Sequence, residues 1–143
     1  MRIETLIIGD ELLDGRATDT NSVRFARALG EYGLRLSRRT TITDDIEIIV
    51  AEARAIAARG TELCLVSGGL GPTVDDLTSA AFGQLCGVEL VRDEEQADRI
   101  RQRLERYGRP ITENQLKQAD RPAGAVVIGN PVGTAPGFDI TFE

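Results

Sequence analysis

A run of four apolar residues, 63–66 (LCLV), constrains the fold of this chain more than any other feature. It has no polar residue on either face, so both faces of the strand that it predicts must be covered by other parts of the protein. Strands covered on both faces are typical of parallel sheets, whose connecting helices lie on each side. The run leads directly into the glycine-rich segment 67–72 (SGGLGP). The sequence therefore predicts a central parallel strand that ends in a glycine-rich turn.

Strand and helix patterns alternate along the rest of the chain. Alternation of this kind forms a mostly parallel sheet through right-handed crossovers, so we predict an α/β fold. The 143 residues contain no linker or internal repeat, which predicts a single domain, 1–143. Because the sequence stops at Glu143 before the last predicted strand has ended, we expect the natural domain to be truncated here at its carboxyl end. The other strands are expected at 3–8, 34–42, 88–91, 125–128 and 138–142, and the helices at 18–32, 46–59, 76–86, 93–107 and from 112 to near Pro122.

The absence of histidine narrows the chemistry. Ser-His-Asp and Cys-His catalysis are excluded, so acid–base work must fall to carboxylates, Lys, Tyr or metal-activated water. The net charge of −6 offers no basic stripe to nucleic acid, and the arginines of the helix expected at 93–107 lie among glutamates, as on a solvated helix face. No apolar run approaches the ~20 residues of a membrane helix. Cys64 and Cys86 lack metal-ligand spacing and indicate buried, reduced thiols. We therefore expect a cytoplasmic protein that binds neither nucleic acid nor membranes.

Acidic or glycine-rich turns follow four of the predicted strands, at 9–15, 43–45, 67–76 and 129–137. In an open α/β sheet the ligand binds outside the carboxyl ends of the strands. We therefore expect these four turns to converge on one cleft.

The turn 67–76 is the strongest candidate for a binding site. Its glycines lack a Cβ, so backbone N–H groups can approach a phosphate closely, and the following helix adds the positive end of its dipole. The pattern is neither a P-loop nor a dinucleotide-binding fingerprint. The alternative is a tight strand-to-helix turn in which Asp76 is the helix N-cap. The expected ligand-binding residues are Ser67, Gly68, Gly69, Gly71, Pro72 and Thr73 of this turn, with Gly9, Asp10 and Glu11 of the first turn and Asn130, Gly133 and Thr134 of the last.

Carboxylates gather where a phosphate is expected. Asp75 and Asp76 would repel an anion unless a cation intervenes, and hard oxygen ligands suit Mg²⁺, Mn²⁺ or Co²⁺. We expect a divalent ion held by Asp75, Asp76 and Asp10, with Glu11 and Asp44 as further candidates. Capping is the alternative, because an aspartate at a helix start contributes about 1 kcal/mol without any function. For Asp44 or Asp45 taken singly, capping is favoured.

The segment 130–138 contains two prolines and two glycines, which predict a rigid loop. Thr134 and backbone N–H groups could hold a phosphate or a ribose hydroxyl. The alternative is a rigid turn without a ligand.

Four stretches of this sequence resemble the amino-terminal domain of the CinA (competence/damage-inducible protein) family. More broadly they resemble the molybdopterin-binding domain of the MogA, MoaB and gephyrin group. The combination of GDELL, SGGLGPTVDD and NPVGTAPG is typical of the CinA branch. The molybdenum-cofactor branch more often has Thr-Gly in the loop where this chain has Gly69-Leu70-Gly71. The matching stretches are 7–15 with 19–21, 67–78, 113–119 and 130–138.

The resemblance implies a three-layer α/β/α fold that binds an anionic nucleotide or pterin. For the CinA branch it implies metal-dependent ADP-ribose pyrophosphatase activity, and for the molybdenum branch molybdopterin binding and adenylylation. It points to Asp76 as the functional acid of the glycine loop and, less directly, to Asp44. The family's nicotinamide-nucleotide deamidase domain and its proline-rich segment near the site follow the part of the family chain that this sequence matches. We therefore do not expect deamidase activity here.

Three functions follow from these observations. The first is hydrolysis of a pyrophosphate bond in ADP-ribose or a related nucleotide. The loop glycines would cradle phosphate, Asp76 with Asp75 or Asp10 would hold the metal, and metal-activated water would be the nucleophile, since no side chain is an obvious one. The second is pterin adenylyl transfer, and the third is a non-catalytic nucleotide-binding or oligomerisation module. We also expect a homo-oligomer.

Overall fold

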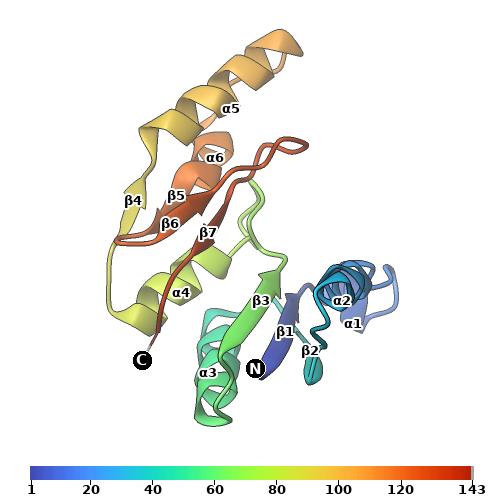
Figure 1. Cartoon of the computed structure of the whole chain (residues 1–143). Helices are drawn as coiled ribbons and strands as arrows, with labels where there is room; N and C mark the ends of the chain where they lie inside the picture. Colours follow the sequence, from blue (N-terminus) through green and yellow to red (C-terminus); the bar gives the residue numbers. More distant parts are fainter. Residues whose placement is uncertain (143) are drawn as a thin grey trace. The chain divides into compact units, whose positions relative to one another are not determined.

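The computed structural model describes residues 1–142, which form two compact units (Figure 1). The first unit contains residues 1–69, and the second begins at Leu70. The domain expected from the sequence spans both units.

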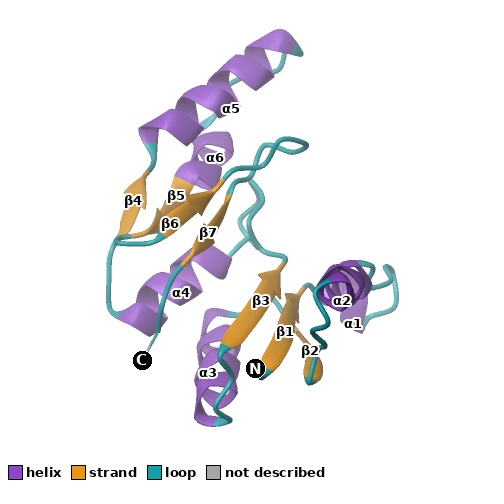
Figure 2. Ribbon diagram, viewed as in Figure 1, coloured by secondary structure: helices purple, strands orange, loops and turns teal. Residues whose placement is uncertain are grey.

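The first unit is built on a three-stranded sheet whose strands are all parallel (Figure 2). The strand at 3–8 lies in the middle, between the strands at 38–42 and 63–67, so the order is β2-β1-β3. This arrangement confirms the parallel sheet that the alternating pattern predicts. The strands are β1 (Ile3–Ile8), β2 (Arg38–Ile42) and β3 (Leu63–Ser67), and the helices are α1 (Asp10–Leu13), α2 (Asn21–Glu31) and α3 (Ile46–Ala58).

The strand order places α2 and α3 on opposite faces of this sheet. The chain moves from β1 outward to β2, and then back past β1 to β3. Because crossovers between parallel strands are right-handed, this reversal of direction moves the connecting helix to the other face. Figure 1 shows α2 and α3 on either side of the sheet.

The central strand of the first unit is β1 rather than the strand at 63–66. All six residues of β1 are buried, as expected for a strand covered on both faces. β3 lies at an edge of this sheet, and its first residue, Leu63, is 38% exposed. The apolar run at 63–66 therefore predicts the strand correctly but not its central position.

Helix α3 follows from its sequence. The carboxylate of Asp45 accepts the backbone N–H of Ile48 at 3.0 Å, which identifies Asp45, and not Asp44, as the N-cap. Gly60 has a φ of +73° just after the helix, a conformation that favours glycine. The buried face consists of Ile49, Val50, Ala53 and Ile56. Helical periodicity predicts these four residues together with Ile46 and Ala57, of which Ile46 is half-buried and Ala57 is exposed.

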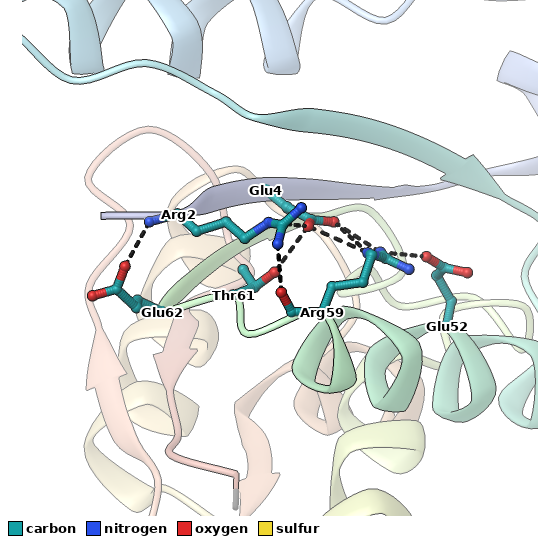
Figure 3. Close-up of polar contacts among 6 residues, drawn as sticks. All are labelled: Arg2, Glu4, Glu52, Arg59, Thr61 and Glu62. Carbon is teal, nitrogen blue, oxygen red and sulfur yellow. Dashed lines mark hydrogen bonds and ion pairs between the residues drawn. The ribbon is translucent and has the colours of Figure 1, made fainter.

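A buried carboxylate joins β1 to the end of α3 (Figure 3). Glu4 of β1 is 0% exposed, and its Oε2 accepts a hydrogen bond from Arg59 Nη2 at 2.8 Å. Thr61 Oγ1 donates to Glu4 Oε1 at 2.9 Å, and Arg2 Nε lies 3.5 Å from the same oxygen. Arg59 also pairs with Glu52 at 3.0 Å. The hydrogen bond from Arg59 holds the pKa of Glu4 below its usual value, although burial acts in the opposite direction.

The second unit combines helices with two small antiparallel sheets (Figure 2). The strand expected at 125–128 pairs antiparallel with the last strand, and not within a parallel sheet as predicted. A further strand, β5 (Asp120–Pro122), lies where the sequence predicts the end of a helix. The helices are α4 (Thr78–Cys86), α5 (Glu94–Arg106), α6 (Glu113–Leu116) and the 3-10 helix η1 (Lys117–Ala119), and the strand pairs are β4 (Leu90–Arg92) with β5 (Asp120–Pro122) and β6 (Val126–Ile128) with β7 (Gly137–Asp139).

Side-chain caps fix the starts of α5 and α6 where the sequence predicts them. The carboxylate of Asp93 accepts the backbone N–H of Gln96 at 3.1 Å, and the hydroxyl of Thr112 accepts that of Gln115 at 3.3 Å. A cluster of buried apolar residues packs beneath α5. Its members are Ala97, Ile100, Leu104, Leu116 and Ala119.

Helices α3 and α5 each contain 13 residues. No helix among residues 1–142 has the length and apolar composition needed to cross a membrane.

Candidate functional site

The carboxyl ends of the three strands of the first unit lie side by side. Ile8 of β1 pairs with Ile42 of β2, and Ile7 pairs with Ser67 of β3. The turns at 9–15, 43–45 and 67–76 therefore begin at one edge of the sheet, as predicted for these three. The fourth turn, 129–137, belongs to the second unit.

Asp10 and Asp44 meet at this edge. The backbone N–H of Asp10 donates to Asp44 Oδ2 at 3.0 Å, and the hydroxyl of Thr43 donates to Asp10 Oδ1. The backbone N–H of Gly9 donates to the carbonyl of Ile42 at 3.0 Å, which continues the β1–β2 pairing. The Asp44 carboxylate thus lies against the backbone of Asp10, and the Asp10 carboxylate against the hydroxyl of Thr43, at the ends of two neighbouring strands.

Glu11 lies in α1, a short helix where the sequence predicts a turn. It is exposed, and its carboxylate folds back toward Gly9, where an added Cβ would lie 2.7 Å from Oε1. Because that carboxylate is the far end of a flexible side chain, the contact does not itself require glycine at position 9.

Gly68 brings the end of β3 against β1. Its φ is +105°, and a Cβ at this position would lie 1.9 Å from the carbonyl oxygen of Ile8. A side chain cannot fit there, so glycine is required by the packing of the two strands. Gly69 follows with a φ of +66°, which also favours glycine. The backbone conformation therefore favours glycine at the first two glycine positions of the loop, whether or not a ligand binds there.

Ser67 is held by the first residue of α2. Asn21 Nδ2 donates to Ser67 Oγ at 2.8 Å. A serine hydroxyl that accepts a hydrogen bond keeps its own hydrogen, so Ser67 can still donate to an oxygen of a ligand. Asn21 is not among the predicted site residues. It lies in the stretch 19–21, whose resemblance to the CinA family could have identified it.

In the second unit, Asp76 folds the glycine loop onto itself. Its Oδ2 accepts hydrogen bonds from the backbone N–H and the hydroxyl of Thr73, both at 2.7 Å. A Cβ on Gly71 would lie 2.7 Å from the same oxygen. Although burial acts in the opposite direction, hydrogen bonds from Thr73 and Gly71 hold the pKa of Asp76 below its usual value, with help from Lys117. Asp76 is therefore ionised at neutral pH.

Asp76 does not cap the following helix. Helix α4 begins at Thr78, two residues later than predicted, and its N-cap, Leu77, makes no side-chain cap hydrogen bond. The N-cap alternative for Asp76 is therefore wrong, because its carboxylate turns back to Thr73 instead. Pro72 immediately precedes the turn that this contact closes.

Lys117 brings a positive charge to this loop. Its Nζ donates to the carbonyl of Thr73 and, at 3.3 Å, to that of Asp76. Sequence reasoning counted only the charges within the strand-end turns and missed this residue, which lies 44 positions from Thr73. Lys117 lies in the stretch 113–119, whose resemblance to the CinA family could have identified it.

The three predicted metal ligands are divided between the units: Asp10 lies in the first, and Asp75 and Asp76 lie in the second. Asp75 is exposed and makes no hydrogen bond or ion pair with other residues of 1–142, Asp76 closes its own loop, and Asp10 belongs to the first unit. Over the same described residues, no three Asp, Glu or Cys side chains form a group that could hold a metal. The pair Asp10 and Asp44 suits an ion that takes its other ligands from water and substrate phosphates, as Mg²⁺ commonly does.

Asn130 organises the rigid loop predicted at 130–138. Its Oδ1 accepts the backbone N–H groups of Val132 at 3.0 Å and Gly133 at 2.8 Å, and its Nδ2 donates to the carbonyl of Ala135 at 2.9 Å. The hydroxyl of Thr134 donates to the buried Gln118 at 2.7 Å. These contacts within the second unit explain the loop without a ligand.

The cysteines offer no nucleophile. Cys64 and Cys86 are free thiols and are half-buried, whereas the sequence predicts full burial. Burial raises the pKa of Cys64 to about 11, and the nearby charge of Glu4 adds to this effect. At neutral pH Cys64 is therefore a thiol, which is a poor nucleophile.

Comparison with other proteins links the chain to known sequences. Residues 4–142 match the family described as "Probable molybdopterin binding domain". A CinA-like protein of Anaeromyxobacter sp. (strain K) is 43% identical over 140 residues, which cover 98% of this chain and 34% of that protein. A CinA-like protein of Shewanella amazonensis is 39% identical over 145 residues, which cover 100% and 34%. The chain thus spans about a third of the length of these relatives.

Solved structures agree with this assignment. The crystal structure of CinA, a protein of unknown function from Thermoplasma acidophilum, matches with a TM-score of 0.82 and 35% identity over 96% of this chain and 79% of that one. MoaB of Thermus thermophilus matches with a TM-score of 0.58 and 21% identity over 88% and 72%, which shows the fold alone. The mixed α/β fold with its parallel sheet is therefore that of the molybdopterin-binding proteins, as the sequence predicts. The chain belongs to the molybdopterin-binding domain family and, within it, is CinA-like.

Proposed function

We propose that this chain binds a phosphate-bearing nucleotide or pterin at the strand ends of the first unit and, with a divalent cation, hydrolyses a diphosphate bond such as that of ADP-ribose. The observation that carries the proposal is the alignment of three parallel strand ends. It puts a glycine backbone, a serine hydroxyl and two carboxylates at one edge of the sheet. Ligands of open α/β sheets bind at this edge.

The phosphate would lie against Ser67, Gly68 and Gly69. The two glycines leave room for a phosphate to approach the backbone. Asn21 fixes the oxygen of Ser67, so the hydroxyl can donate to the ligand with little loss of freedom. These groups would orient the diphosphate without supplying any charge.

Asp10 and Asp44 would hold the divalent cation. Two carboxylates beside a diphosphate repel it. A divalent cation, when bound, supplies the positive charge that reverses the local field. Mg²⁺, Mn²⁺ and Co²⁺ all suit the oxygen ligands that this pair offers.

Hydrolysis of ADP-ribose adds one water across the diphosphate bridge. One P–O bond forms, one bridging P–O bond breaks, and the products are AMP and ribose 5-phosphate. The chain has no histidine, so a carboxylate must accept the proton that the water loses.

The test is release of AMP from ADP-ribose by the purified chain with Mg²⁺, Mn²⁺ or Co²⁺, followed by chromatography. We expect cation-dependent AMP release that Asp44→Asn abolishes. Asp14→Asn, which changes an exposed acid paired with Arg16, is the matched control and should retain activity. Failure to release AMP with any of the three ions would contradict the hydrolase. Thermal stabilisation by ADP-ribose without turnover would instead indicate a binding module, and adenylylation of a pterin by ATP would indicate the transferase.

A further inference from the structure

A groove in the second unit lies outside the site proposed above. It lies between α5 and the loop 130–134 and has a volume of about 330 Å³. This volume is within the range of small-molecule sites. Its charged lining residues are Arg99, Arg103 and Arg106, and no aspartate or glutamate of residues 1–142 lines it.

The three arginines share one face of α5 because they are four and three residues apart. Arg101, on the same helix, does not line the groove and pairs instead with Asp98 at 2.6 Å. The sequence suggests a solvated face for all the arginines of this helix. The structure divides them into a paired set and a set that faces the groove.

Arg103 is fixed at the centre of this set. Its Nη2 donates to the carbonyl of Val132 at 2.5 Å, and its Nη1 donates to that of Gly133 at 3.3 Å. Its guanidinium lies 5.9 Å from the centre of the Tyr107 ring. A guanidinium has five N–H donors, so Arg103 retains donors for a ligand after these contacts. Its partners in the loop are neutral carbonyls, so its charge is not cancelled there.

The other two arginines also keep most of their charge. Arg99 pairs with Glu95 at 3.5 Å, but both side chains are largely exposed, 62% and 75%, and such pairs are weak. Arg106 forms no ion pair with any residue of 1–142. Three like charges that line one groove repel one another, and an anion among them removes that repulsion. This arrangement occurs in a chain whose net charge is −6, so it is not a consequence of overall composition.

We propose that this groove binds the diphosphate, or another phosphate oxyanion, of a small molecule. Arg103 is the fixed contact, and Arg99 and Arg106 close on the anion from the same helix face. The planar guanidinium fork matches the oxygens of a phosphate, which favours this ligand over a simple halide ion. The neutral donors Gln96 and Gln102 also line the groove and can complete its hydrogen bonds. The site uses none of the residues assigned to hydrolysis.

The test is a titration of the ¹⁵N-labelled chain with inorganic pyrophosphate, observed by NMR in the presence of excess chelator. The chelator removes the cation that the proposed hydrolase site needs, so the two proposals can fail separately. We expect saturable shifts at the amides of Gly129, Gly133 and Thr134 and at the arginine Nε groups. A parallel titration with ADP shows whether a nucleotide diphosphate or only the free anion is accepted.

The variant for this test is Arg99→Gln with Arg106→Gln, which leaves the loop contacts of Arg103 intact. We expect it to weaken pyrophosphate binding at least about tenfold, since each change removes a charge-assisted contact. Arg101→Gln is the matched control on the same helix and should change the affinity less than about twofold. Unchanged binding in the double variant would overturn the proposal. Shifts that depend on protein concentration and not on pyrophosphate would also overturn it, because they would show that a second copy of the chain fills the groove.

Discussion

The carboxylate of Asp44, just after β2, accepts the backbone N–H of Asp10, the first residue of α1, at 3.0 Å. This contact ties the short helix after one strand to the end of its neighbour. It also places the Asp44 carboxylate against the backbone of Asp10 at the edge of the sheet where we propose that the ligand binds.

Asp44→Asn should reduce hydrolysis of ADP-ribose while leaving the stability of the fold nearly unchanged. Asparagine can still accept the N–H of Asp10, so we expect the free energy of unfolding to change by less than about 1 kcal/mol. The charge is lost, and hydrolysis of ADP-ribose should fall at least about a hundredfold. Asp44→Ala removes the hydrogen bond as well and should lower the melting temperature further. Full activity in Asp44→Asn would remove this residue from the mechanism.

Asp76→Asn should lower the free energy of unfolding by about 1–2 kcal/mol, because it weakens charge-assisted hydrogen bonds within the loop. Urea denaturation measures this loss, and the turnover of the same variant should be measured at a temperature where it is folded. Unchanged stability together with lost turnover would contradict the loop-closing role. That result would favour the functional acid that the CinA resemblance implies.

Gly68→Ala and Gly71→Ala should differ in severity. At Gly68 the new Cβ meets the backbone oxygen of Ile8 at 1.9 Å and the φ is +105°, so we expect a loss of about 3 kcal/mol or more. At Gly71 the new Cβ meets the carboxylate of Asp76, which can move, so a loss of about 1 kcal/mol is expected. Denaturant unfolding of both variants checks the order. Equal losses of unfolding free energy would show that the contact of Gly68 with β1 is not what requires glycine at this position.

Local patterns predict part of this fold well. β1 is predicted at its observed bounds, and Asp45, Asp93 and Thr112 cap helices where their sequences indicate. These features depend on residues within one turn or one strand, so a single sequence contains the information.

Features that depend on distant residues are not predictable in this way. β5 forms because Asp120–Pro122 pairs with β4, where Arg92 Nε lies 2.8 Å from the carboxylate of Asp120. Helix α1 has only four residues, too few to show a helical period. In the glycine loop, the sequence shows the acids and the glycines. It does not show that the carboxylate of Asp76 turns inward or that Lys117 approaches from elsewhere in the chain.

Glu4→Gln should be strongly destabilising, although no sequence pattern marks Glu4. It leaves a buried amide beside Arg59, and the loss of one partner of a buried ion pair costs about 3 kcal/mol. Glu62→Gln is the matched control, because Glu62 belongs to the same cluster in Figure 3 but its side chain is 62% exposed. It should cost less than about 0.5 kcal/mol.

The buried ion pair of Glu4 and Arg59 also makes the stability of the fold depend on pH. The pKa of Glu4 is lowered in the folded chain from a usual value of 4.5, so the unfolded chain binds a proton more readily. The stability due to Glu4 is therefore complete above about pH 5 and is lost as the pH falls through the folded pKa. The unfolding free energies of the wild type and Glu4→Gln should therefore converge as the pH falls through the folded pKa, which lies below 4.5. A constant difference from pH 7 to pH 3 would contradict this account.

The most direct test of the proposed ligand site is the affinity for ADP-ribose, measured by calorimetry first with excess chelator and then with millimolar Mg²⁺ or Mn²⁺. Asp10 and Asp44 meet at the sheet edge, and Ser67, Gly68 and Gly69 contribute no cationic side chain there. We therefore predict at least about tenfold tighter binding with the cation, and loss of this gain in Asp10→Asn with Asp44→Asn. Equal affinity in both buffers would contradict the central claim that a divalent cation joins these carboxylates to the ligand's phosphates.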